Sequence, residues 1–136
     1  MACRAAALVG LAAAAAAAGA QQPATVHIAG HLIGWTGTHD AYVALWNDST
    51  FLHTPIREIK LPAGGDSTYT FDVAAGKWAL SAYEDRNENG KLDMGLFGPK
   101  EPAGFWRAFH GWHKPWFRNV AVDVTADMSD ANVKIR

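Results

Sequence analysis

Short oxygen-bearing side chains recur at alternate positions in a nine-residue run near the middle of the chain. The run carries them at its first, third, fifth and ninth positions, which are Asp85, Asn87, Asn89 and Asp93. This spacing suits a hard cation, because alternate residues of a tight loop point inward and the glycine at the sixth position, Gly90, permits a sharp bend. Lys91 is expected to offer only its backbone carbonyl. The run therefore predicts a calcium-binding loop.

The run differs from a helical calcium loop at its twelfth position, where Leu96 stands in place of a bidentate glutamate. The apolar segments on either side have the period of strands, so a helix-loop-helix site is not expected. Glu84 or Glu101 would supply the missing carboxylate. The alternative is a plain hairpin, because Asn89-Gly90 is by itself a strong signal for a tight turn.

A second group of candidate residues lies between Gly104 and Phe117, in a connection rich in glycine and proline. The candidates for ligand binding in this stretch are Trp106, Arg107, His110, Trp112, His113 and Trp116. Long connections without regular structure are usually functional or disordered, and the aromatic density argues against disorder. Exposed tryptophans would stack against sugar rings or other flat apolar groups, which predicts an unidentified glycan or protein ligand. The structural alternative is that Trp106 and Phe109 cap one end of the fold.

The histidines permit a further hypothesis, a transition-metal site. His110 and His113 are three residues apart and would share a metal ion if His39 or His53 joined them. Strong zinc signatures pair close ligands with a third and a fourth, so two histidines form a weak motif.

The sequence contains none of the common catalytic signatures. It has no Gly-x-Ser-x-Gly elbow, no His-Glu-x-x-His and no phosphate-binding glycine loop, and its one cysteine is Cys3. We therefore expect no catalytic residues and a protein that is not an enzyme. The alternative from another class is a small metal-dependent hydrolase or isomerase that uses His110 and His113.

The first twenty residues have the layout of a secretory signal peptide. Arg4 precedes an apolar run from Leu8 to Ala17, and Ala18-Gly19-Ala20 fits the small-residue rule for cleavage before Gln21. Removal of residues 1–20 would leave a single domain, residues 21–136, with no cysteine and so no disulfide. We expect a periplasmic or secreted protein whose mature chain has no transmembrane segment.

The mature part of the chain shows the period of two that is typical of half-buried strands. Apolar residues alternate with polar or small ones in three segments: 26–32, 68–73 and 120–124. Segments 41–47 and 77–84 are apolar on both faces, which predicts central strands, and 132–136 predicts a final edge or outer strand. Pro55 places segment 51–61 at an edge or a bulge. Together these segments predict an all-β fold, an antiparallel β-sandwich of about seven strands with a transthyretin-like or immunoglobulin-like arrangement.

The run from Ala75 to Asp93, followed by Phe97 to Phe105, resembles a family of exported bacterial proteins known as domain of unknown function DUF2141. In that family a Gly-x-aromatic-Ala strand leads into an Asp-x-Asn-x-Asn-Gly-x-x-Asp loop, a Gly-x-Pro-Lys-Glu segment and a Gly-Phe pair. The resemblance extends to Pro115-Trp116-Phe117 and the closing strands. This chain differs from the pattern at Trp78, where tyrosine is usual, and at Glu84, where histidine is common. The resemblance implies an exported β-sandwich similar to transthyretin-like and carboxypeptidase-regulatory modules, and no established activity.

Charge narrows the expected partners further. Without the first twenty residues the chain has 11 Lys and Arg against 13 Asp and Glu, and it contains no basic run. Nucleic acid is therefore not an expected partner. The expected function is that of a non-enzymatic, calcium-stabilised binding or interaction module of the cell envelope, with a carbohydrate-binding module that uses the Trp106 to Trp116 stretch as an alternative. No organic cofactor is expected.

Overall fold

The computed structural model describes residues 24–96, 98–111 and 113–136, and their fold is almost entirely β. Strands account for 44% of the described residues and helix for 4%, which confirms the predicted fold class. The predicted signal peptide and its cleavage point lie outside the described residues. Among the described residues no helix has the length and apolar character needed to cross a bilayer.

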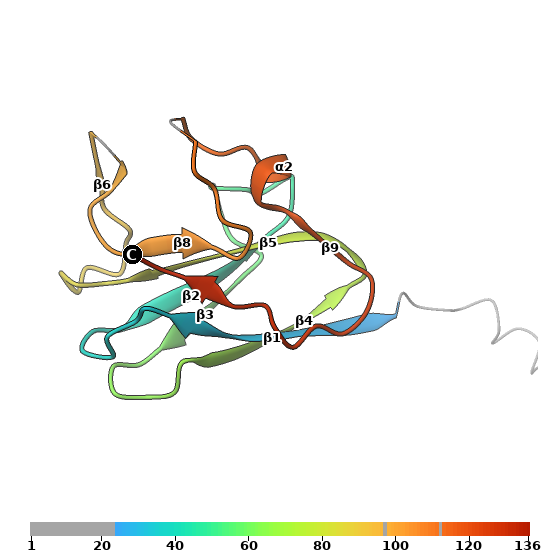
Figure 1. Cartoon of the computed structure of the whole chain (residues 1–136), viewed down its shortest axis with the longest axis horizontal. Coiled ribbons are helices and arrows are strands. Elements are labelled where there is room, and N and C mark those ends of the chain that lie inside the picture. Colours follow the sequence, from blue (N-terminus) through green and yellow to red (C-terminus); the bar gives the residue numbers. More distant parts are fainter. Residues whose placement is uncertain (1–23, 97, 112) are drawn as a thin grey trace, which may run out of the picture.

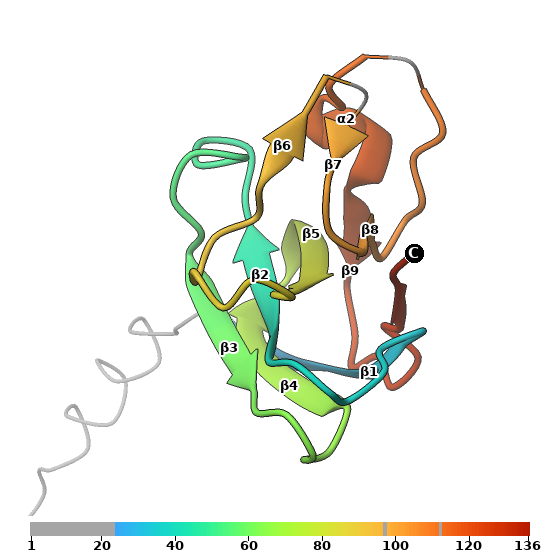
Figure 2. The same cartoon turned by 90° about the vertical axis from the view of Figure 1, so that its left-hand side faces the viewer.

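Two sheets form the body of the molecule (Figure 1), and their buried residues share one core. The first sheet has the order β10-β1-β4, with β1 (Thr25–Ile33), β4 (Thr68–Ala74) and β10 (Val133–Lys134). The second has the order β3-β2-β5-β8, with β2 (Ala41–Trp46), β3 (Arg57–Leu61), β5 (Gly76–Glu84) and β8 (Ala103–Phe105). Strand β9 (Val122–Val124) pairs with the start of β5, and the short helix α2 (Phe117–Val120) precedes it. Strands β6 (Met94–Gly95) and β7 (Gly98–Pro99) form a separate small hairpin that projects from the sheets (Figure 2).

The main core lies between the two sheets, where the predicted period of two is observed. The buried residues of β1 and β4 that face this core are Val26, Ile28, Leu32, Tyr69, Phe71 and Val73. They pack against Val43 and Leu45 of β2 and Leu80 of β5. Burial of this apolar surface, worth roughly 25 cal/mol per Å², holds the two sheets together.

Strands β2 and β5 are central and apolar on both faces, as predicted, because a second apolar cluster covers the outer face of their sheet. Ala44 and Trp46 of β2 pack there with Phe117 and Val120 of α2. The Trp46 and Phe51 rings meet edge to face, with their centroids 6.0 Å apart. The segment after β2 and the segment around α2 thus form a third layer over part of the sandwich.

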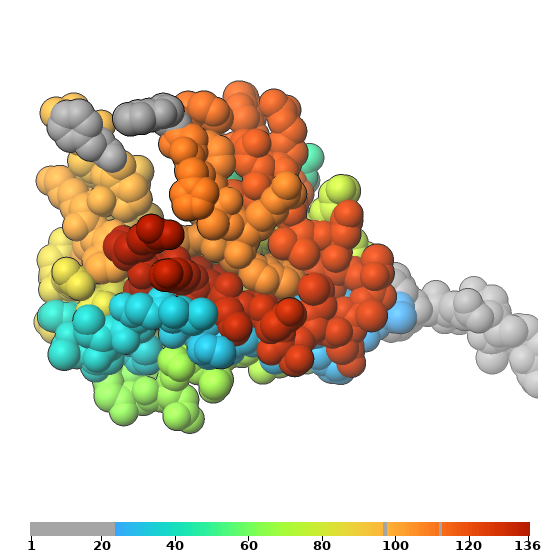
Figure 3. Space-filling view, in the orientation of Figure 1, coloured from blue at the N-terminus to red at the C-terminus, as the bar shows by residue number. Residues whose placement is uncertain are grey.

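The end of the chain differs from the sequence prediction in two ways. Val120 closes α2 instead of beginning a strand, because the Asn119 side chain caps the helix start by accepting the Trp116 N–H and the Ala121 N–H closes its one turn on the Phe117 carbonyl, each at 2.9 Å. The final strand lies at a sheet edge as predicted, but only Val133–Lys134 form it and they pair with β1 in parallel. Figure 3 shows the red C-terminal part of the chain between blue β1 and the orange segment that contains β8, although Val133 itself is buried.

Candidate functional site

The loop from Asp85 to Asp93 begins where β5 ends. Both the backbone and the side chain of its first residue, Asp85, form hydrogen bonds. The Asp85 N–H donates to the Asp40 carbonyl at 2.8 Å. The Asp85 side chain is 3% exposed and accepts the N–H groups of Asn89 at 3.2 Å and Gly90 at 2.7 Å. Gly90 has φ of 72°, so the positive φ that the sequence predicts for the bend is present.

The side chains that the sequence predicts to converge do come together within this loop. Asn87 and Asn89 both donate their amide hydrogens to the carboxylate of Asp93, and Asn89 lies 3.0 Å from each of its oxygens. The Oδ1 atoms of the two asparagines accept backbone N–H groups two residues further on, from Asn89 at 3.3 Å and Lys91 at 2.9 Å. The loop is therefore a chain of Asx turns closed by one carboxylate.

The sequence leaves Glu84 and Glu101 as alternatives for the additional carboxylate, and the structure places only one of them at the loop. Glu101 lies outside the run, between β7 and β8, but its side chain is 6% exposed and reaches into the loop. Its Oε1 accepts the Asn87 N–H at 3.3 Å and its Oε2 accepts the Asp93 N–H at 3.4 Å. Glu101 thus belongs to the loop site.

Glu84 belongs to a different group of side chains. It is fully buried, and its carboxylate accepts the Thr36 hydroxyl at 2.7 Å and lies 3.5 Å from Nδ1 of His39. Arg86 lies 3.7 Å from the same carboxylate. Burial alone would raise the pKa of Glu84, but the hydrogen bonds from Thr36 and His39 and the charge of Arg86 together outweigh it, so the pKa lies below its usual value. Glu84 is therefore a satisfied structural anion.

Strand β5 holds the loop through one more contact. The hydroxyl of Tyr83 donates to the Gly90 carbonyl at 3.1 Å. Burial, followed by the charges of Glu58 and Asp85, raises the pKa of Tyr83 well above its ordinary value, so the phenol stays protonated and remains a donor.

The loop site is rich in negative charge. Asp85, Asp93 and Glu101 make no ion pair with any Lys, Arg or His of the described residues. Their partners are the N–H groups of the loop itself and the amides of the two asparagines. Across residues 24–96, 98–111 and 113–136, no three His, Cys, Asp or Glu side chains are arranged to hold a metal ion. A cation at this loop would have to use amide and carbonyl oxygens beside the carboxylates, as hard cations do.

The aromatic stretch after β8 divides into two parts. Trp106 is half-buried and packs against the main core, and Phe109 packs against the outer cluster, so both have the structural role that the sequence left as an alternative. Trp116, by contrast, is 61% exposed. The predicted ligand residue Trp112 lies outside the described residues.

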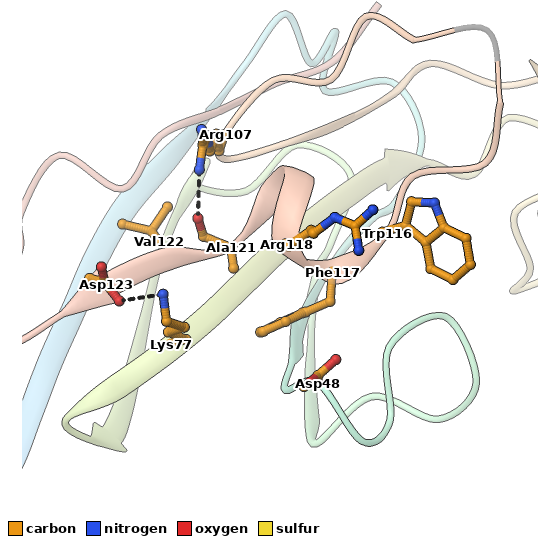
Figure 4. A pocket seen from close by; sticks show the side chains of 9 residues that line it. All are labelled: Asp48, Lys77, Arg107, Trp116, Phe117, Arg118, Ala121, Val122 and Asp123. Carbon is orange, nitrogen blue, oxygen red and sulfur yellow. Dashed lines mark hydrogen bonds and ion pairs between the residues drawn. The ribbon is translucent and has the colours of Figure 1, made fainter.

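Arg107 and Trp116 line the same open groove, of about 630 Å³, beside α2 (Figure 4). The polar side chains that complete its lining, and that were not among the residues predicted from the sequence, are Asp48, Lys77, Arg118 and Asp123. Lys77 and Asp123 are cross-strand partners of β5 and β9, and their side chains form an ion pair at 3.2 Å. Of these four residues, only Arg118 could have been found from the sequence, because it stands two residues after Trp116. Asp48, Lys77 and Asp123 could be placed beside Trp116 only once the arrangement of the strands was known.

The two histidines of this stretch lie outside the groove lining. His110 and His113 are exposed, and His113 donates from Nδ1 to the Lys114 carbonyl at 2.8 Å. His39 lies beside Glu84, and no group of three potential ligands within the described part of the chain includes these histidines.

Comparison with known proteins identifies the family. A family model described as "Uncharacterized protein conserved in bacteria (DUF2141)" matches residues 40–132, a range that contains the loop, Glu101 and the groove. No curated protein matches the chain. A crystal structure of a DUF3823 family protein from Parabacteroides merdae is similar, with 13% identity and a TM-score of 0.40 over 84% of this chain and 47% of that one. This chain thus spans about half the length of that structure. Because the family model covers well over half of the residues, the chain belongs to the bacterial family DUF2141.

Proposed function

We propose that the loop from Asp85 to Asp93 binds calcium with the help of Glu101, and that the protein is a non-enzymatic, calcium-stabilised binding module of the cell envelope. One observation carries the proposal. Asp85 and Asp93 of the nine-residue loop and Glu101 beside it accept hydrogen bonds from the loop, two of these three residues are buried, and none has a cationic partner among the described residues. Buried charges are normally paired or coordinate a metal.

The hydrogen bonds within the loop leave room for a cation. Each carboxylate or amide oxygen has two lone pairs, and a single N–H uses only one of them. The Oδ1 atoms of Asn87 and Asn89 accept one backbone N–H each, so each retains a second lone pair. Both asparagines are exposed, and a cation would take the position that their amide hydrogens now fill beside Asp93.

The composition of the loop predicts weak binding. The twelfth position lacks a bidentate glutamate, and the carboxylates of Asp85 and Glu101 already accept backbone N–H groups. The dissociation constant should therefore fall in the class of extracellular calcium modules, on the order of 0.1 to 1 mM. The signal-like first twenty residues fit the same setting, because calcium is abundant outside the cytoplasm.

Thermal melts with a chelator and with calcium test the proposal. At free calcium of about ten times the dissociation constant, binding to the folded state alone adds about 1.4 kcal/mol, which should raise Tm by roughly 5 °C. Asp93→Ala and Asp85→Ala should abolish this shift, and Asn87→Ala should reduce it. Magnesium at the same concentration should give a much smaller shift, because it demands a stricter octahedral geometry.

Two control variants make the test specific. Lys91→Ala should keep the full calcium shift, because only its backbone is proposed to take part. Asp66→Ala removes an exposed carboxylate from another turn and should also keep it. Wild-type melts that are the same with chelator and with calcium would overturn the proposal and leave a hairpin of Asx turns.

A further inference from the structure

The groove beside α2 is separate from the loop site. Its lining residue Lys77 lies at the start of β5, and Asp85 follows the end of the same strand. At the usual rise of a strand these residues are about 25 Å apart. A ligand in the groove would therefore not touch the proposed calcium site.

An exposed tryptophan and an arginine form one wall of the groove. The Arg118 guanidinium lies over the Trp116 ring, 5.6 Å from its centroid, and Figure 4 shows the two side chains next to each other above Phe117. The backbone beneath them is held by α2, because Asn119 both accepts the Trp116 N–H and donates its own N–H to the Trp116 carbonyl at 2.9 Å. The backbone that carries the pair is thus held before any ligand arrives, which lowers the entropic cost of binding.

The charges of the groove are mixed and only partly matched. Lys77 is paired with Asp123. Arg107 donates only to the Ala121 carbonyl, at 3.4 Å, and neither Arg107 nor Arg118 has a carboxylate partner within the described residues. Asp48, on the segment after β2, likewise has no ion-pair partner there.

We propose that this groove binds an acidic oligosaccharide. The Trp116 ring would stack against one sugar ring, and the guanidinium groups of Arg107 and Arg118 would pair with the carboxylates of the oligosaccharide. A planar aromatic surface takes the apolar face of a sugar ring, and a guanidinium matches a carboxylate with two parallel hydrogen bonds. Asp48 and Asp123 accept hydrogen bonds from sugar hydroxyls. A volume of about 630 Å³ lies within the range of small-molecule sites.

The same lining disfavours other ligands. A neutral glycan would leave two guanidinium groups without a counter-charge. A ligand that carries both carboxylates and many hydroxyls uses both arginines and both aspartates of the groove, while Lys77 stays paired with Asp123.

Titration with a matched pair of saccharides tests this inference. Tetragalacturonate and its methyl ester have the same rings but differ in charge. Each is added to the purified protein up to about 10 mM, and binding is measured by titration calorimetry and by tryptophan fluorescence. The acidic form should bind, and the ester should bind at least tenfold more weakly. A tetra-aspartate peptide separates the role of the sugar from that of charge and should bind at least tenfold more weakly as well.

Variants assign the binding to the groove. Arg118→Gln and Arg107→Gln should each weaken binding of tetragalacturonate by about tenfold or more, because each removes a charged hydrogen bond. Trp116→Ala should weaken the binding of both saccharides. Arg136→Gln, at an exposed arginine outside the groove, should leave the binding of both unchanged. Circular dichroism and a melt of each variant confirm that it is folded.

Three outcomes would overturn the inference. The first is the absence of any binding of tetragalacturonate by the wild type. The second is equal binding of the acid and the ester, which would remove the role of the guanidinium groups. The third is unchanged binding in folded Arg107→Gln and Arg118→Gln. The titrations are repeated with a chelator, so that saccharide binding can be interpreted even if the loop does not bind calcium.

Discussion

Glu101 accepts the backbone N–H of Asp93 at 3.4 Å across the β6–β7 hairpin, although eight positions separate the two residues. Its other carboxylate oxygen accepts the N–H of Asn87 on the far side of the loop. One buried side chain thus joins both arms of the nine-residue loop. The conformation of the loop depends on a residue that the loop does not contain.

Replacement of Glu101 by glutamine should show this dependence. Glutamine keeps the size of the side chain but has one oxygen in place of two, so one loop N–H would face an amide N–H group. A buried donor without an acceptor costs about 1–3 kcal/mol. Because the two N–H groups here are part-buried, we expect Glu101→Gln to lower the free energy of unfolding by about 1 kcal/mol in urea titrations with chelator present.

The control for this variant is Glu88→Gln, in the same loop. Glu88 is exposed, so its change should stay within about 0.5 kcal/mol. Equal stabilities of Glu101→Gln and the wild type would show that Glu101 does not hold the loop.

The sequence was sufficient to predict the features that depend on local patterns. The alternation of apolar residues in β1 and β4 identified both strands and their buried faces, because side chains of a strand alternate between faces. The spacing from Asp85 to Asp93 and the positive φ of Gly90 followed from the needs of a tight loop. Glu101 was one of two candidates, and only the path of the chain after β7 decided between them.

The features that the sequence missed depend on contacts between distant segments. The outer apolar cluster brings Phe51 to Phe117, with ring centroids 5.7 Å apart. The sequence pattern of neither segment predicts this contact. The Lys77–Asp123 pair exists because β9 pairs with the start of β5. The apolar spacing through Val120 predicts a strand, but side chains at short intervals also suit one turn of helix.

The close approach of the C-terminal segment to β8 leads to a second prediction. A Cβ added at Gly104 would lie 2.0 Å from the Lys134 carbonyl oxygen, so the two backbones would have to separate. Gly104→Ala should lower the free energy of unfolding by about 1–3 kcal/mol or more in urea titrations. At Gly95 an added Cβ meets the flexible Lys100 side chain at 3.3 Å, so Gly95→Ala should cost much less. Similar losses in the two variants would contradict the packing of this segment.

A third prediction concerns the pH dependence of the first sheet. His27 of β1 forms an ion pair with its cross-strand partner Asp72, and this hydrogen bond and charge, together with the charge of Asp127, raise the pKa of His27 above 6.5. Its contribution to stability is therefore present in full below pH 6.5 and is lost as the pH rises through the raised value. NMR titration should show the raised pKa, and Asp72→Asn should lower it toward 6.5. An unchanged value in Asp72→Asn would remove the ion pair as its cause.

A fourth prediction concerns maturation of the chain. The small residues Ala18-Gly19-Ala20 after an apolar run predict cleavage before Gln21. Intact-mass measurement of the protein from the envelope fraction of a bacterial host should give a product that begins at Gln21. A product in that fraction that still begins at Met1 would contradict the predicted signal peptide, whereas Ala20→Leu should slow the cleavage by removing the small residue at the site.

The bend of the loop provides the last prediction, which separates backbone strain from calcium binding. Gly90 has φ of 72°, and a Cβ added there would meet nothing within 4 Å, so a substitution costs only what the backbone conformation demands. For an L-residue the left-handed conformation costs roughly 1–2 kcal/mol, most for a β-branched residue and least for asparagine. Gly90→Val should therefore be destabilised both with chelator and with calcium, while Gly90→Asn should keep most of the stability in each condition. Equal losses for valine and asparagine would mean that the loop does not need the positive φ. A loss for valine that appears only with calcium would place the strain in the calcium-bound loop alone.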